Sequence, residues 1–71
     1  MIKWTRKDTR YSPEGYWAAE MPDGSCASIE RDGHTYRVFR AMKKYNFRAR
    51  VDTFAEARRA AQTAPEEEVV P

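Results

Sequence analysis

Residues 32–61 read DGHTYRVFRAMKKYNFRARVDTFAEARRAA, and the rest of the chain is interpreted outward from them. The dipeptide Asp32-Gly33 lies between two segments of alternating apolar and polar residues, which is typical of a two-residue β-hairpin turn of type I′. Such a turn places Ile29 directly opposite Tyr36. The apolar side chains of both strands then share one face of a sheet, so the turn and the alternation predict the same hairpin.

Residues 45–51 alternate almost perfectly, which predicts a further strand with one apolar face and one basic face. We expect the preceding turn to centre on residues 43–44. The cross-strand pairs predicted from this turn are Tyr36–Val51, Arg37–Arg50, Val38–Ala49 and Phe39–Arg48. Any turn of even length keeps the same side chains on the same faces.

A helix is predicted to begin after Thr53, because Thr53 and Glu56 form the Thr-x-x-Glu pattern of a capping box. Pro65 is expected to end it, because the residue before a proline disfavours helical backbone angles. Its predicted apolar side contains Phe54, Ala57, Ala60, Ala61 and Ala64. Small alanines allow a helix to lie close to a sheet.

The predicted fold class is α+β, with a three- to four-stranded antiparallel β-meander and one C-terminal α-helix packed on one face. In the N-terminal half we expect a short strand or arm over residues 2–6, a loop over 7–15, and strands over 16–20 and 25–31. Residues 1–64 are expected to form a single small domain. Residues 65–71 are expected to be a disordered acidic tail, because they offer little to pack.

The distribution of charge is more informative than the net charge of +2. Residues 31–50 contain seven basic and one acidic side chain, whereas residues 11–30 contain four acidic and no basic side chains. Most of the positive charge therefore belongs to the last two predicted strands and their connecting turn. Basic residues concentrated in this way are one feature of nucleic-acid-binding proteins.

The face opposite the helix carries the candidate binding site. The candidate residues are Arg37, Phe39, Arg48, Arg50, Lys43, Lys44 and Trp17. Trp17 is included on the condition that the turn over residues 21–24 preserves an even register, because a three-residue loop with a bulge would turn it inward. Arg37 opposite Arg50 is a destabilising like-charge pair, and Phe39 lies exposed among arginines. Both features favour an anionic partner.

Three interpretations of this face stay open at this point. It is a solvated surface, a nucleic-acid-binding surface, or a protein-binding or homodimer surface. For nucleic acid, a twisted sheet fits the major groove of duplex DNA, and aromatic side chains could instead stack on single-stranded bases. We expect nucleic acid, with duplex DNA preferred. The alternative is a phage-type interaction module or homodimer that modulates a host protein.

Two segments carry a resemblance to a known family. They read Gly33-x-x-Tyr36-Arg37-Val38-Phe39 and Phe47-x-Ala49-x-Val51-x-Thr53-Phe54-x-Glu56-Ala57. Residues 31–62 thereby resemble the N-terminal three-stranded DNA-binding module of phage and transposon tyrosine integrases, the AP2-like fold. The resemblance implies a sheet laid in the major groove, with Arg37, Arg48 and Arg50 contacting bases or phosphates. No catalytic integrase domain follows this segment, so we expect a small stand-alone phage or prophage accessory protein.

No enzyme activity, catalytic residue, cofactor or metal site is expected. Cys26 and His34 are the obvious nucleophile pair, but the predicted register separates them by about 16 Å along the sheet. One cysteine and one histidine cannot build a zinc site alone. The single cysteine and the absence of an apolar leader or a membrane-spanning run lead us to expect a cytoplasmic protein without a membrane partner.

Overall fold

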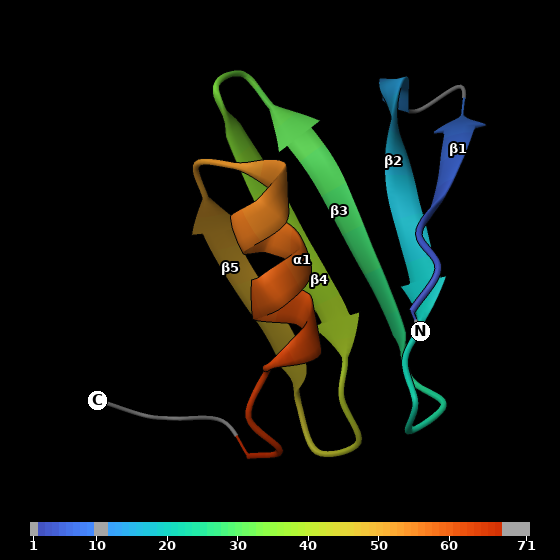
Figure 1. The fold of residues 1–71 in the computed structure, drawn as a ribbon, viewed down its shortest axis with the longest axis vertical. Coiled ribbons are helices and arrows are strands. Elements are labelled where there is room, and N and C mark those ends of the chain that lie inside the picture. Colours follow the sequence, from blue (N-terminus) through green and yellow to red (C-terminus); the bar gives the residue numbers. More distant parts are fainter. Residues whose placement is uncertain (1, 10–11, 68–71) are drawn as a thin grey trace.

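The computed structural model describes residues 2–9 and 12–67 of the chain. The elements are β1 (Thr5–Thr9), β2 (Ser12–Glu20), β3 (Cys26–Asp32), β4 (Thr35–Ala41), β5 (Asn46–Val51) and α1 (Phe54–Gln62). The strands form one antiparallel sheet in the order β1-β2-β3-β4-β5 (Figure 1). The α+β class, the meander and the C-terminal helix are confirmed, and the sheet has five strands instead of three or four.

The additional strand comes from the segment that was predicted to be a loop. Residues 7–15 belong largely to β1 and β2, so that prediction is wrong. Lys7 pairs with Tyr16 and Thr9 with Ser12, and the register shifts between these two pairs. Pro13 and Gly15 fall inside the shifted part, where a β-bulge tolerates residues that disrupt regular pairing. Turn-forming residues therefore mark an irregular hairpin here.

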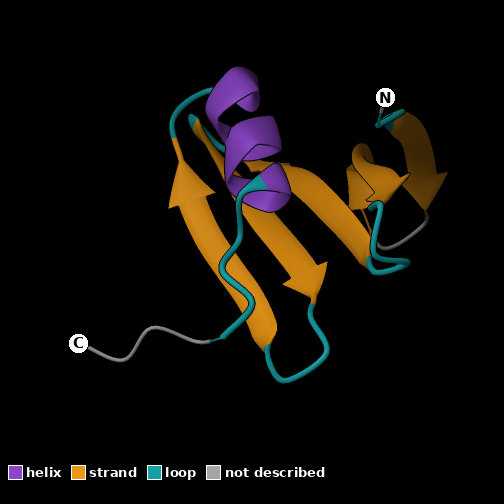
Figure 2. Cartoon of the chain, turned by 60° about the horizontal axis from the view of Figure 1, so that its bottom comes forward, coloured by secondary structure: helices purple, strands orange, loops and turns teal. Residues whose placement is uncertain are grey.

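The helix lies over one face of β3, β4 and β5, and the β1–β2 hairpin turns toward the same side (Figure 2). Five residues connect Glu20 to Cys26, and this odd number places Trp17 opposite Ile29. The Trp17 ring consequently lies 4.8 Å from the Phe54 ring, measured between centroids. The hypothesis that Trp17 belongs to the face opposite the helix is wrong, because its ring is part of the core layer.

The core is small and is centred on Ile29 and Val38, whose side chains are fully buried. Ala57 and Ala61 of α1 are buried against them, as their small size allows. The helix begins after Thr53, whose hydroxyl oxygen accepts a 3.1 Å hydrogen bond from the backbone N–H of Glu56. The predicted cap is therefore confirmed. The predicted core residues Tyr36, Phe47, Ala49, Val51 and Phe54 all pack against this cluster.

The β3–β4 turn lies one residue later than predicted, which shifts the cross-strand register by two residues. Asp32 pairs with Thr35, so the loop is Gly33-His34 and not Asp32-Gly33. Gly33 has a φ of +64°, and no non-glycine residue of the described chain has a positive φ. A positive φ at the first loop position alone is the pattern of a type II′ turn, whereas type I′ requires it at both. A shift of two residues leaves every side chain on its predicted face.

Arg40 is the one charged residue that the described fold buries, with 6% of its surface exposed. It lies on the helix side of β4, where its guanidinium joins two distant segments. It donates hydrogen bonds to the Ala61 carbonyl at the end of α1 (2.7 Å), to the Ser25 hydroxyl (2.9 Å) and to the Asp23 carboxylate (2.9 Å). The β2–β3 loop and the C-terminal end of the helix are thereby held to the same strand.

The Asp23 carboxylate makes this arrangement sensitive to pH. Hydrogen bonds donated by the Ser25 hydroxyl and backbone N–H, together with Arg40, lower the pKa of Asp23 from its usual 3.8. A carboxyl whose pKa is lowered by folding stabilises the protein above its unfolded-state pKa, and this stabilisation is lost as the pH falls. We expect Asp23→Asn to be less stable than the parent at about pH 6, and we expect this difference to shrink as the pH falls below the usual pKa of 3.8.

Urea unfolding of both proteins across this pH range measures the difference. Glu20→Gln, an exposed carboxylate near the same loop, is the matched control. A stability difference for Asp23→Asn that does not change with pH would show that the carboxylate charge is not involved.

The helix ends two residues earlier than Pro65 alone would require. Thr63 is the C-cap, and its backbone N–H and hydroxyl both donate to the Arg59 carbonyl. The next residues return to the β4–β5 turn, where the Tyr45 hydroxyl donates to the Pro65 carbonyl (2.6 Å) and Lys44 pairs with Glu67 (2.7 Å). Residues 65–67 of the predicted disordered tail therefore have defined contacts, and residues 68–71 lie outside the described residues.

Candidate nucleic-acid interface

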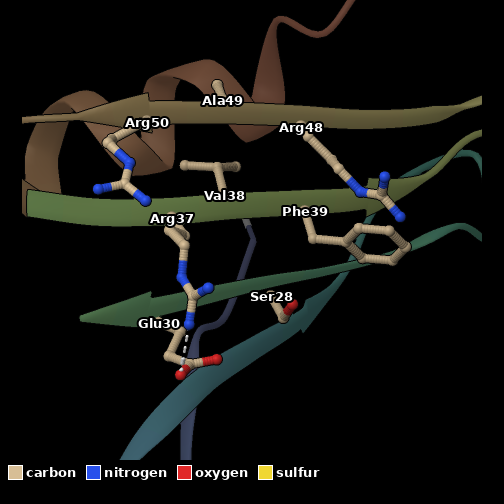
Figure 3. A pocket seen from close by; sticks show the side chains of 8 residues that line it. All are labelled: Ser28, Glu30, Arg37, Val38, Phe39, Arg48, Ala49 and Arg50. Carbon is tan, nitrogen blue, oxygen red and sulfur yellow. Dashed lines mark hydrogen bonds and ion pairs between the residues drawn. The ribbon is translucent and has the colours of Figure 1, made fainter. Parts of the chain in front are cut away.

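The sheet face opposite α1 forms a shallow hollow of about 420 Å³. We call this surface the open face. Its side chains are Ser28, Glu30 and Asp32 of β3, Arg37 and Phe39 of β4, and Arg48 and Arg50 of β5. Phe39 and Arg48 lie toward one end of the hollow, and Arg37, Arg50 and Glu30 lie toward the other (Figure 3). The one helix of the described residues lies on the other side of the sheet, so these side chains are available to a ligand.

Arg37 and Arg50 lie directly opposite each other, as the sequence predicts. Two carboxylates of the same fold offset this like-charge pair, so the pair alone is no argument for an anionic partner. The Asp32 carboxylate lies 3.1 Å from the Arg50 guanidinium and 3.8 Å from that of Arg37. A Glu30 oxygen lies 2.9 Å from Arg37. The two-residue shift of the β3–β4 register brings both carboxylates to this position, and exposed ion pairs of this kind contribute only modestly to stability.

Arg48 differs from Arg37 and Arg50 in that its contact is with an aromatic ring. Its guanidinium carbon lies 5.6 Å from the centroid of the Phe39 ring, which is a cation–π contact. In the part of the chain that the structure describes, no carboxylate lies within ion-pair distance of Arg48. Phe39 is half-buried and lies opposite Ser28, so only part of its side chain is exposed to a ligand. This pair combines an uncompensated positive charge with an aromatic surface.

The remaining predicted site residues lie elsewhere. Lys43 and Lys44 are exposed in the β4–β5 turn, beyond the end of the open face. Lys44 is paired with Glu67, whereas Lys43 has no ion-pair partner among residues 2–9 and 12–67. Trp17 lies on the opposite side of the sheet and is removed from the site. The structure thus brings together Arg37, Phe39, Arg48 and Arg50, with two carboxylates beside them: Glu30, which the predicted register places at the end of this face, and Asp32, which it places in the turn.

The described residues form neither a metal-ion site nor a Cys26–His34 pair. Among them no group of three or more histidine, cysteine, aspartate or glutamate side chains is arranged to hold a metal ion. Cys26 is exposed at the start of β3, whereas His34 lies in the turn after the other end of that strand. No helix in the described ranges has the length and apolar character needed to cross a membrane.

Known proteins offer no further guidance on this surface. Comparisons of the chain with models of protein families, with curated proteins and with solved structures found no match. The AP2-like resemblance of residues 31–62 accordingly stays a prediction.

Proposed function

We propose that this protein binds nucleic acid through the open face, with duplex DNA as the preferred form. The observation that carries the proposal is the Phe39–Arg48 pair, because it presents an aromatic ring and a guanidinium without a carboxylate partner. Arginine contacts phosphates and guanine edges, and exposed aromatic rings stack on unpaired bases. The AP2-like resemblance and the expected cytoplasmic, phage-type accessory role belong to the same proposal.

The two carboxylates on the open face set the expected strength of binding. Arg37 and Arg50 must exchange contacts with Glu30 and Asp32 for contacts with phosphates, so they contribute less than Arg48. Affinity is therefore expected to be modest and strongly dependent on salt. Release of counterions lowers the logarithm of the affinity by roughly 0.9 for each tenfold rise in salt and each neutralised phosphate.

The double variant R48A/R50A is expected to weaken DNA binding and to reduce the magnitude of the salt slope by about two units. Fluorescence anisotropy of a labelled duplex and of one of its single strands, each at two salt concentrations, measures both effects. The control matched in charge is R58A/R59A, which removes two exposed arginines from the helix on the other side of the sheet. Equal losses for R58A/R59A would attribute binding to net charge alone.

A variant that is expected to bind DNA more tightly than the wild type also tests the open face. Glu30→Gln removes the carboxylate closest to Arg37, 2.9 Å away, without changing the size of the side chain. We expect tighter DNA binding, since Arg37 no longer has to give up an ion pair. If wild-type protein binds duplex and single strand no better than a neutral protein does at low salt, and E30Q changes nothing, the proposed function is wrong.

A further inference from the structure

β5 is the last strand of the described sheet, and among residues 2–9 and 12–67 no strand lies beside its outer edge. Residues 46–51 all pair with β4, without any irregularity of register. Within the described chain, the only elements that contact β5 are β4 and α1. An edge strand presents a row of unpaired N–H and C=O groups, which is a template for another strand.

β5 carries only one of the features that usually protect such an edge, the positive charge of Arg48 and Arg50. Its sequence, NFRARV, contains no proline and no glycine, and its pairing contains no bulge. The opposite edge of the sheet differs, because β1 carries the register shift between Lys7 and Thr9. Prolines, bulges and very short strands are the common means of preventing strand addition, so β5 is the more receptive edge.

The side chains of β5 define the chemistry of a strand that could pair with it. On the open face lie Arg48, which has no carboxylate partner in the described chain, and Arg50, whose side chain is 58% exposed. On the helix side, Phe47, Ala49 and Val51 are only partly buried at the rim of the core. An incoming strand places alternate side chains beside these two rows. Acidic side chains suit the first row and apolar side chains suit the second.

A second copy of this chain does not meet these requirements. Antiparallel pairing of β5 with itself keeps the open faces of both copies on the same side, so Arg48 and Arg50 of one copy meet the same arginines of the other. Like charges in cross-strand pairs are destabilising. The edge therefore favours a different partner over self-association.

We propose that the free edge of β5 binds an extended segment of a partner protein in which acidic and apolar side chains alternate. The backbone of this segment adds a sixth strand to the sheet, which is recognition by β-augmentation. Its acidic side chains pair with Arg48 and Arg50, and its apolar side chains extend the core beside Phe47 and Val51. This inference concerns the strand edge and does not depend on the proposed binding of nucleic acid.

The test uses the full chain, labelled with nitrogen-15, and a fluorescent peptide of alternating glutamate and valine. Backbone amide shifts are expected to change chiefly at residues 46–51. Each of Arg48→Ala and Arg50→Ala is expected to weaken binding about twofold to fivefold, the range given by one cross-strand ion pair. Arg59→Ala, the control on the other side of the sheet, is expected to leave binding unchanged.

Two modified peptides separate strand addition from simple charge attraction. Each carries N-methyl groups on alternate residues, one on the glutamates and the other on the valines, and therefore blocks one hydrogen-bonding edge. Strand addition predicts that one of them binds at least tenfold more weakly than the parent peptide. Equal binding of all three peptides, shift changes centred on residues 28–39 with β5 unaffected, or no binding at all would overturn the proposal.

Discussion

Replacing Arg40 by alanine is expected to lower the free energy of unfolding by about 3 kcal/mol, near the lower end of the cost of breaking a buried charge pair. The variant leaves the Ala61 carbonyl without its guanidinium donor and removes the contacts that hold Asp23 and Ser25. The Asp23 side chain is 54% exposed and can regain water, which is why we expect the lower end of that range. Domains of this size are seldom stable by more than about 5 kcal/mol, so a large fraction should unfold at body temperature.

Urea denaturation followed by far-UV circular dichroism measures this loss. Arg40→Met keeps most of the apolar stem but donates no hydrogen bond, so it separates lost packing from lost bonding. Arg37→Ala is the matched control on the same strand, because Arg37 is half-exposed and points to the open face. We expect Arg37→Ala to change stability by less than about 1 kcal/mol. Wild-type stability in Arg40→Met would show that the guanidinium contacts contribute nothing.

Replacing Trp17 by alanine is expected to lower the free energy of unfolding by about 2 to 3 kcal/mol. Full truncation of a buried tryptophan costs about 3 to 5 kcal/mol, and the Trp17 side chain is only partly buried. The loss arises because the indole packs on Phe54, with 4.8 Å between ring centroids, and Phe54 in turn lies 5.9 Å from Tyr36. Thermal unfolding monitored by circular dichroism is the appropriate measurement.

A conservative substitution of Trp17 tests whether this residue packs in the core or contributes to DNA binding. Trp17→Phe preserves an aromatic ring next to Phe54, and we expect it to retain most of the stability. DNA binding by this variant, measured below its unfolding temperature, should equal that of the parent. A selective loss of DNA binding in a fully folded Trp17→Phe protein would return Trp17 to the binding site and contradict the packing described above.

The side of the sheet on which each residue lies could largely be predicted from the sequence, because alternation has a period of two residues. The β4–β5 pairs, including Arg37–Arg50, are confirmed because the turn is centred on residues 43–44, as predicted. The β3–β4 register was wrong by two residues because alternation fixes only the faces and not the centre of the turn. A shift of two preserves every face, so alternation cannot distinguish an Asp32-Gly33 loop from a Gly33-His34 loop.

The partners of individual charges could not be predicted in this way. The two-residue shift of the β3–β4 register decides whether Glu30 and Asp32 lie beside Arg37 and Arg50. Alternation does not reveal this shift, because every side chain stays on the same face. The burial of Arg40 was not predicted, although Arg40 follows Tyr36 and Val38 by four and two residues and therefore lies on the same, buried side of β4. This alternation was the available signal, but the Asp23 and Ala61 oxygens that accept its hydrogen bonds lie 17 and 21 residues away in the sequence. Only the packed structure brings them together.

The order of the strands has a consequence for how the chain folds. Every strand pairs with its immediate neighbour in the sequence, so the whole sheet can be assembled from successive local hairpins. Chains dominated by such local contacts cross a small entropic barrier and fold quickly. The nine-residue helix is too short to persist in water by itself. The helix therefore depends on its packing against the sheet for its stability.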